Sequence, residues 1–158
     1  MTTLTALADE LITLVTSVPA FQEQGYAFYS LEDLLRLTQL QTLPIVAVGY
    51  NGAAPVAGNR AANVEARSHT AVLCELQFLV VVSVQYQFAG QEDTKPTAYA
   101  LLDQVRTRVS GFKGVNQRAW QWMGEQPEPE AAADSVIFYS QRWHTVMPVV
   151  GEFNRVTF

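Results

Sequence analysis

The feature that most constrains the fold is an alternation of apolar and polar residues in the middle of the chain. Apolar side chains occupy every second position from Val72 to Phe88, and glutamate, glutamine or serine stands at five of the positions between them. A period of two residues predicts a β-strand. At about 3.3 Å per residue, an unbroken strand from Ala71 to Phe88 would outrun an ordinary domain. We therefore expect this strand to bend, to bulge or to project beyond the body of the protein.

A shorter strand is predicted before this segment. Ile45 to Tyr50 form a compact β-branched run, and the turn-forming pair Asn51-Gly52 is expected to end it. Residues 51–70 are rich in alanine, glycine, asparagine and arginine and follow neither a helical nor a strand period. They predict a long loop.

The last third of the chain predicts a strand and less regular segments. Val136 to Val146 has the pattern of a strand with Ile137, Tyr139 and Trp143 on one face. Residues 117–123 fit a short strand, and residues 125–134, with two prolines and three alanines, predict a loop. Residues 150–158 predict an edge strand or a C-terminal arm with the apolar side chains Phe153, Val156 and Phe158.

Three segments carry the spacing of amphipathic helices. The first covers residues 4–18, and the second is short, begins after a Ser30 cap and ends before Pro44. The third is expected to start with Pro96 as its first helical residue and to stop at Gly111. Its apolar stripe consists of Ala98, Leu101, Leu102, Val105 and Val109.

The order of these elements lacks repeated βα alternation. It predicts an α+β fold with a mixed, mainly antiparallel sheet and helices packed on one face. With 158 residues, of which 49% are hydrophobic, the chain can fill one substantial core. A single domain spanning residues 1–158 is therefore expected.

The charge content narrows the classes of partner. Charged residues make up 16% of the chain, below the roughly 25% of typical soluble domains. Part of the surface is therefore expected to be covered by partners. A net charge of −5 argues against a nucleic-acid binder with a broad basic surface. The sequence predicts no secretory signal and no membrane segment, and the protein is expected to fold in the cytoplasm of the cell that makes it.

Candidate catalytic and metal-binding residues are few. Cys74, the single cysteine, is in phase with the apolar side of the predicted long strand, so a buried structural thiol is expected. His69 and His144 have no further ligand at metal-binding spacing, and each is expected at an edge or on the surface. The glycine-containing segment 49–58 lacks the ending of a P-loop. We predict no enzyme activity, no metal and no cofactor.

Charges are distributed unevenly in the second half of the chain. A stretch without acidic residues contains Arg106, Arg108, Lys113 and Arg118. A stretch without basic residues follows and contains Glu125, Glu128, Glu130 and Asp134. The two stretches are either solvated surfaces paired within one chain or complementary surfaces of neighbouring subunits. In the second case, Arg106→Glu with Arg108→Glu should weaken assembly without unfolding the monomer. In a third reading, the basic stretch lines a lumen through which DNA passes.

Four segments resemble, in order and approximate spacing, the Mu-like tail terminator and minor tail proteins of tailed phages. They are Pro44 to Asn51, Leu76 to Phe88, Ala98 to Arg106 and Tyr139 to Trp143. The resemblance covers most of the chain, from Leu4 to about Val146. It implies a sheet flanked by helices and a non-catalytic virion protein.

The resemblance also implies how such a protein acts. Six copies would form a ring on the head-proximal end of the tail tube, stop its polymerisation and offer the surface to which the head joins. The implied partners are further copies of the chain, the tail tube protein and a head-tail connector or neck protein, with non-specific contact to passing DNA.

Two other functions compete with this one. The nearest is another neck or tail-completion protein of similar fold. From a different class, a small-molecule-binding or enzymatic α+β domain would assemble a polar site from Asn51, Arg60, Tyr99 and Trp143. A nucleic-acid-binding module is the weakest alternative, because few aromatic residues are interleaved with the basic ones.

Overall fold

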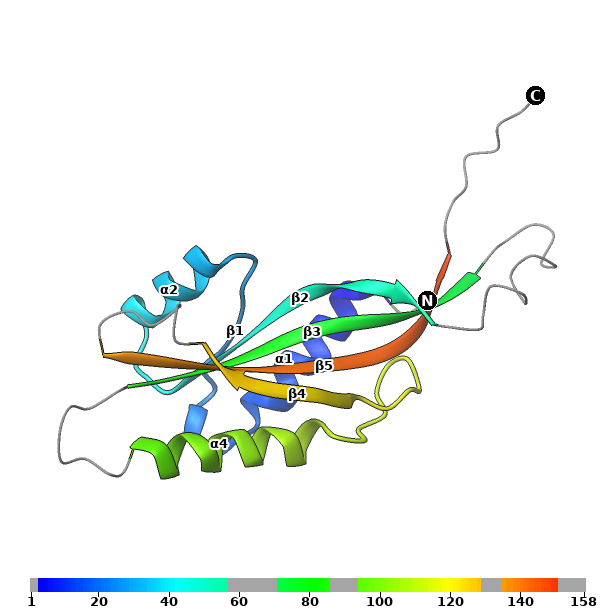
Figure 1. Cartoon of the computed structure of the whole chain (residues 1–158). Helices are drawn as coiled ribbons and strands as arrows, with labels where there is room; N and C mark the ends of the chain where they lie inside the picture. Colours follow the sequence, from blue (N-terminus) through cyan, green and yellow to red (C-terminus); the bar gives the residue numbers. More distant parts are fainter. Residues whose placement is uncertain (1–2, 57–70, 86–93, 129–134, 151–158) are drawn as a thin grey trace.

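A computed structural model of the chain describes residues 3–56, 71–85, 94–128 and 135–150 (Figure 1). In chain order, the elements within these ranges are α1 (Leu4–Thr16), the 3-10 turn η1 (Pro19–Phe21), β1 (Gly25–Ala27), α2 (Leu31–Leu40), β2 (Ile45–Pro55), β3 (Ala71–Gln85), α4 (Thr94–Val109), β4 (Gln121–Pro127) and β5 (Val136–Val150). None of the helices in these ranges combines the length and the hydropathy that crossing a membrane requires.

The five strands form one sheet in the order β1-β2-β3-β5-β4. β1 runs parallel to β2, whereas the pairs β2–β3, β3–β5 and β5–β4 are antiparallel. The predicted α+β class with a mixed, mainly antiparallel sheet is confirmed. Antiparallel neighbours explain why no regular βα alternation is seen in the sequence.

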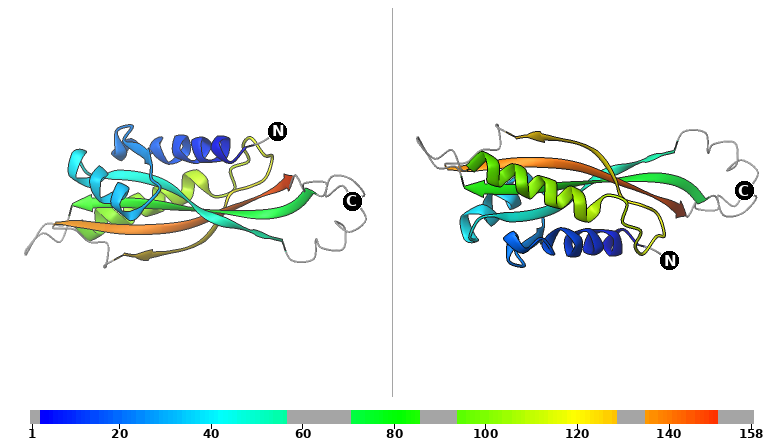
Figure 2. Two further views of the ribbon diagram at one scale, coloured as in Figure 1. Left: turned by 90° about the horizontal axis from the view of Figure 1, so that it is seen from above. Right: turned by 90° about the horizontal axis from the view of Figure 1, so that it is seen from below.

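The predicted long strand is β3, at the centre of the sheet. It pairs with β5 without interruption from Ala71↔Val150 to Gln85↔Val136. Residues 86–88, which the alternation also included, lie outside the described residues. As expected for a strand of this length, β3 projects: with β2 and β5 it continues beyond the region covered by the helices (Figures 1 and 2).

The prediction that Asn51-Gly52 ends the second strand is wrong. β2 continues to Pro55, and its register against β3 shifts between Tyr50 and Gly52. Gly52 has a φ of 109°, a conformation that glycine adopts at little cost, so the pair forms a β-bulge in place of a turn. The predicted loop 51–70 is therefore strand up to Pro55, and its residues 57–70 lie outside the described residues.

The main core lies between one face of the sheet and the helices α1 and α4. Figure 2 shows both helices crossing this face. The five residues of the stripe predicted for α4 are all buried, as are Leu7, Leu11 and Val15 of α1. The sheet contributes side chains on the same face as Phe78, which are Val46, Val48, Cys74, Leu76, Val80, Val82, Val84 and Trp143. The expectation of a buried Cys74 is confirmed, with 8% of the residue exposed.

The ends of α4 agree only partly with the prediction. The helix begins at Thr94, so Pro96 is its third residue and not its first. It ends at Val109, and Gly111 follows with a φ of 77°. The Gly111 backbone N–H donates to the Trp120 carbonyl oxygen at 2.9 Å, which folds the chain back towards β4. The predicted stop at Gly111 is confirmed.

The connection from α4 to β4 is attached to α1 through Glu10. One carboxylate oxygen of Glu10 accepts the indole N–H of Trp120 at 2.9 Å, and the other accepts the backbone N–H of Val115 at 2.7 Å. Trp120 is fully buried, and its ring meets that of Phe78 edge-on at 5.5 Å. Glu10 therefore fixes a loop that lies more than a hundred residues away in the sequence.

The helix α2 packs on the opposite face of the sheet from α4, as Figure 1 shows. Its N-terminus is capped by Ser30, whose hydroxyl accepts the Asp33 N–H at 3.2 Å, as the sequence predicted. Leu34 joins Ala47, Val81 and Phe138 in a small second core. The prediction of helices on one face therefore describes α1 and α4, while α2 covers one end of the other face.

The last two strands differ in how well they were predicted. β5 contains the predicted strand 136–146, with Ile137, Tyr139 and Trp143 on the α4 side, and extends it to Val150. β4 spans Gln121–Pro127, so the predicted strand 117–123 is displaced, and the predicted loop 125–134 begins as strand. Of the predicted C-terminal arm 150–158, Val150 ends β5, and residues 151–158 lie outside the described residues.

Candidate functional site

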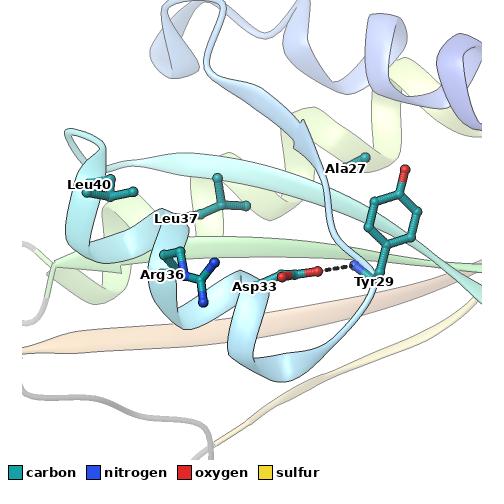
Figure 3. A pocket seen from close by; sticks show the side chains of 6 residues that line it. All are labelled: Ala27, Tyr29, Asp33, Arg36, Leu37 and Leu40. Atoms are coloured by element: carbon teal, nitrogen blue, oxygen red, sulfur yellow. Dashed lines mark hydrogen bonds between the residues drawn. The ribbon is translucent and has the colours of Figure 1, made fainter.

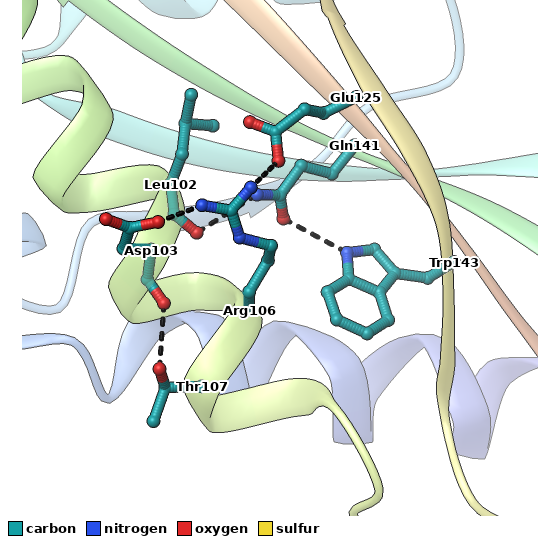
Figure 4. Close-up of polar contacts among 7 residues, drawn as sticks. All are labelled: Leu102, Asp103, Arg106, Thr107, Glu125, Gln141 and Trp143. Atoms are coloured by element: carbon teal, nitrogen blue, oxygen red, sulfur yellow. Dashed lines mark hydrogen bonds and ion pairs between the residues drawn. The ribbon is translucent and has the colours of Figure 1, made fainter.

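Arg106, the first of the predicted interface charges, pairs within its own chain (Figure 4). Its guanidinium contacts the carboxylates of Asp103, one turn earlier on α4, and Glu125 on β4. The same group lies 5.6 Å from the centre of the Trp122 ring, within cation–π range. Arg106 and Glu125, one from each of the two charged stretches, thus hold α4 against the edge strand.

The other basic residues are more available. Arg108 is exposed and donates to the Ser17 hydroxyl at 3.1 Å. Lys113 and Arg118 are exposed in the connection from α4 to β4, and within the described ranges neither side chain forms an ion pair. Together with Arg108, these residues are the positive charges of this stretch that a neighbouring subunit or DNA could neutralise.

The acidic residues are also divided between different surroundings. Glu128 lies just after β4, where its Oε1 accepts the Ser140 hydroxyl at 2.6 Å and the Gln126 side-chain amide at 2.8 Å. Glu130 and Asp134 lie outside the described residues. Pairing within one chain therefore accounts for Arg106 and Glu125, and an intersubunit role for the remaining charges stays a prediction.

The alternative polar site is not assembled by the described residues. Asn51 is exposed in the bulge of β2, Tyr99 is exposed on α4, and Trp143 is buried beneath α4. The indole N–H of Trp143 donates to Gln141, which itself donates to the Leu102 carbonyl oxygen (Figure 4). Arg60 lies outside the described residues. Trp143 therefore belongs to a buried network that joins β5 to α4.

Tyr139 predicts a loss of stability at alkaline pH. Burial raises the pKa of its phenol above the ordinary value near 10, and the neighbouring Tyr99 raises it further. As the pH rises through 10, the unfolded chain loses this proton first, so the free energy of unfolding is unaffected below pH 10 and falls above it. In urea unfolding at about pH 8 and about pH 11, Tyr139→Phe should lose less stability than the wild type. An equal alkaline loss in both proteins would contradict this assignment.

The sequence predicted His144 at an edge or on the surface, but it lies on the inner strand β5 and is largely buried. Its Nε2 lies 2.7 Å from the Gln121 side-chain oxygen and its Nδ1 lies 3.3 Å from a Glu75 carboxylate oxygen. These partners come from the two strands that flank β5, and 13% of the histidine side chain is exposed. Within the described ranges, no three histidine, cysteine, aspartate or glutamate side chains gather as a metal site. His69 lies outside those ranges.

The surface around α2 carries large apolar side chains that are exposed to solvent. Leu40 is 72% exposed, Leu31 is 53% exposed, and Tyr29, just before the helix, is 90% exposed. Exposed apolar side chains that gather in one place mark surfaces that bind other molecules. We refer to these three residues as the α2 surface.

Two hollows adjoin the α2 surface. The first, about 280 Å³, lies beside the segment that leads from β1 into α2 (Figure 3). Its lining consists of Ala27, Tyr29, Asp33, Arg36, Leu37 and Leu40. In Figure 3, the Asp33 carboxylate accepts the Tyr29 backbone N–H, at 3.2 Å. Asp33 is therefore engaged in the cap of the helix.

The second hollow, about 470 Å³, lies between α2 and the strands β3 and β5, and we call it the α2 groove. Its walls are formed by Phe28, Leu34, Leu79, Val81, Phe138 and Ser140, and Leu31 and Glu128 complete it. The groove is apolar except for the Ser140 hydroxyl and the Glu128 carboxylate. Neither hollow contains Asn51, Tyr99 or Trp143.

The α2 surface has only a weak signal in the sequence. A helix whose leucines recur every three or four residues is expected to bury them, and Leu34 does so. The spacing does not reveal that Leu31 and Leu40 remain exposed. The excess of apolar over charged residues in the whole chain was the available signal.

No protein-family model matches the chain, and no curated protein matches it.

Proposed function

We propose that this protein is a structural component of a phage tail, which caps the head-proximal end of the tail tube as a ring of identical subunits. The observation that carries the proposal is the α2 surface. It combines exposed apolar side chains with a groove, on the sheet face that α1 and α4 leave open. A surface of this kind is suited to a neighbouring subunit.

The shape of the sheet supports the same proposal. β3 and β5 pair over fifteen residues each, and their far ends extend beyond the helices in Figure 1. Strands of this length are unusual in a small domain, and neighbouring subunits or the tube could cover the projecting part. The chain's low content of charged residues agrees with a surface that is covered on assembly.

The experiment is to measure tail length by negative-stain microscopy in lysates of a phage or prophage whose copy of this gene is inactivated. Overlong tubes without heads are expected, because nothing would stop tube polymerisation. Normal tails joined to filled heads would remove the terminator role. Tubes of normal length that lack heads would instead indicate another neck or tail-completion protein.

A pair of substitutions then tests Lys113 and Arg118, the two exposed basic residues of the connection from α4 to β4, which form no ion pair within the described ranges. Lys113→Glu with Arg118→Glu is expected to fail in restoring normal tails, whereas the wild-type gene restores them. Because both side chains are exposed, the free energy of unfolding should change by less than about 0.5 kcal/mol. Arg106→Glu is unsuitable here, because it would place a third carboxylate beside Asp103 and Glu125 and destabilise the monomer itself. Full restoration by the double variant would show that these charges are not used in assembly.

The volume of the α2 groove favours one function of a different class. At about 470 Å³ it lies within the range of small-molecule sites, roughly 300–1,000 Å³. A single carboxylate in apolar surroundings would suit an apolar ligand with one cationic group. This function becomes the leading one if the tails of the inactivated phage are normal.

A further inference from the structure

The α2 groove has one charged group, and that group has no cationic partner in the described structure. Glu128 accepts hydrogen bonds from two neutral side chains, those of Ser140 and Gln126. No lysine, arginine or histidine in the described ranges lies within ion-pair distance of its carboxylate. The rest of the groove is apolar, and Leu31 at its side is 53% exposed. The groove therefore suits an apolar segment that carries a positive charge.

A segment with this chemistry follows β5 in the same sequence. Residues 151–158 read Gly-Glu-Phe-Asn-Arg-Val-Thr-Phe. In an extended segment successive side chains alternate between two sides, so Val156 and Phe158 share one side, and the long side chain of Arg155, directly before Val156, leaves from the other. We propose that residues 151–158 of a neighbouring copy lie in the α2 groove, with Val156 and Phe158 against its apolar walls and Arg155 paired with Glu128.

Residues 151–158 are too few to form most of this contact within one subunit. Phe138 lies in the groove near the start of β5, and Val150 is twelve residues away at the other end, about 40 Å along the strand. Phe158 is eight residues beyond Val150 and can reach at most about 29 Å from it. Val156 reaches less far, about 22 Å. The same subunit therefore cannot place Arg155 and Val156 at its own Phe138 and Glu128.

A contact in which one copy gives a segment and the next copy receives it is heterologous. Repeated around an axis, such a contact closes into a ring when the rotation permits. The inference rests on the proposed function in this respect, and it identifies the contact by which the ring is held together. Such a contact would join the α2 surface, at one end of the sheet of one copy, to the chain that follows Val150, at the opposite end of the sheet of the next copy.

A disulfide between two full-length chains tests the contact. Purified Leu31→Cys and Phe158→Cys proteins are mixed under mild oxidation, and the covalent dimer is measured on a non-reducing gel. The control pair is Tyr99→Cys with Phe158→Cys, because Tyr99 is 51% exposed and lies on α4, across the sheet from the groove. We expect about tenfold more dimer from the groove pair than from the control pair, since docking raises the local thiol concentration. The native Cys74 is buried and contributes equally to both pairs.

A charge exchange separates the proposed ion pair from chance collisions. Glu128→Lys in the Leu31→Cys chain is expected to lower the dimer yield towards that of the control. Arg155→Glu in the Phe158→Cys chain, combined with it, is expected to restore most of the yield. Restoration would not occur if Glu128→Lys merely disturbed the bonds to Ser140 and Gln126. Equal yields from the groove and control pairs would overturn the proposal.

The two proposals fail in different ways. Overlong tails in the inactivated phage together with equal cross-linking would leave the terminator role standing and remove the arm from the α2 groove. Normal tails together with strong groove cross-linking would establish a contact between copies and remove the terminator role. A groove that another molecule occupies, such as a tube subunit or a small ligand, would also give equal cross-linking.

Discussion

Replacing Phe78 with alanine is expected to lower the free energy of unfolding by about 3–5 kcal/mol. Phe78 is fully buried in β3, the central strand, between Tyr50 on β2 and Trp143 on β5. Its ring meets those of Tyr50 and Trp120 edge-on, each at 5.5 Å between ring centres. Alanine would leave a cavity beneath α1 and α4 and remove both aromatic contacts.

Urea unfolding followed by tryptophan fluorescence measures this loss. The matched control is Phe112→Ala, which removes the same atoms from a side chain that is 41% exposed. We expect the control to cost less than about 1 kcal/mol. If Phe78→Ala cost no more than Phe112→Ala, the surrounding side chains would have to close the cavity, and the packing of Tyr50 and Trp120 would not be as specific as the ring geometry indicates.

Periodic burial was the part of the fold that could be predicted from the sequence. The alternation that located β3 arises because Phe78 and every second residue on either side of it face the core beneath α1 and α4. The stripe on α4, from Ala98 to Val109, was visible for the same reason. In both cases one face of the element is buried in the core and the other is not. Under this condition the spacing of apolar residues in the sequence indicates the type of secondary structure.

Predictions from the sequence were wrong where an element does not bury one regular face in the core. β4 is an edge strand whose residues are mostly exposed, so Gln121–Pro127 carries no alternation, and its position was predicted four residues too early. At the bulge in β2, the turn-forming pair Asn51-Gly52 predicted the end of the strand, but β2 continues past Gly52 because it stays paired with β3. Tertiary hydrogen bonding decided both outcomes, and it is not encoded in neighbouring residues.

The candidate site was predicted only in part, because contacts between distant residues decide what a charge or a leucine does. Pairing of the two charged stretches within one chain was one of the readings of the sequence, and Arg106 with Glu125 follows it, but the sequence did not say which charges would pair. Glu128 was named for its charge alone, and its place in the α2 groove became visible only when β4 was set beside β5. The sequence predicted the short helix that contains Leu31 and Leu40, but the spacing of its leucines does not reveal that these two are exposed.

Glu10→Ala and Gly114→Ala are each expected to destabilise the protein by about 1–3 kcal/mol, the cost of leaving a buried donor without a partner. The Glu10 carboxylate accepts hydrogen bonds from the N–H groups of Trp120 and Val115, and removing it leaves the buried indole N–H without this acceptor. A Cβ atom at Gly114 would occupy the same space, since its three nearest atoms would all belong to the Glu10 carboxyl group. Alanine there is expected to displace the carboxylate and to break the same two hydrogen bonds.

The double variant decides whether the two effects share this cause. In the Glu10→Ala background the space beside Gly114 is free of the carboxylate, so alanine at position 114 should not lower the stability. It could raise the free energy of unfolding by up to about 1 kcal/mol, because alanine reduces the conformational entropy of the unfolded chain. A double-mutant cycle measured by urea unfolding should therefore show a coupling energy nearly as large as either single loss. Asp9→Ala, which removes an exposed carboxylate from the adjacent position of α1, should change stability by less than about 0.5 kcal/mol. Additive losses in the double variant would mean that Gly114 is required for a reason other than the approach of Glu10.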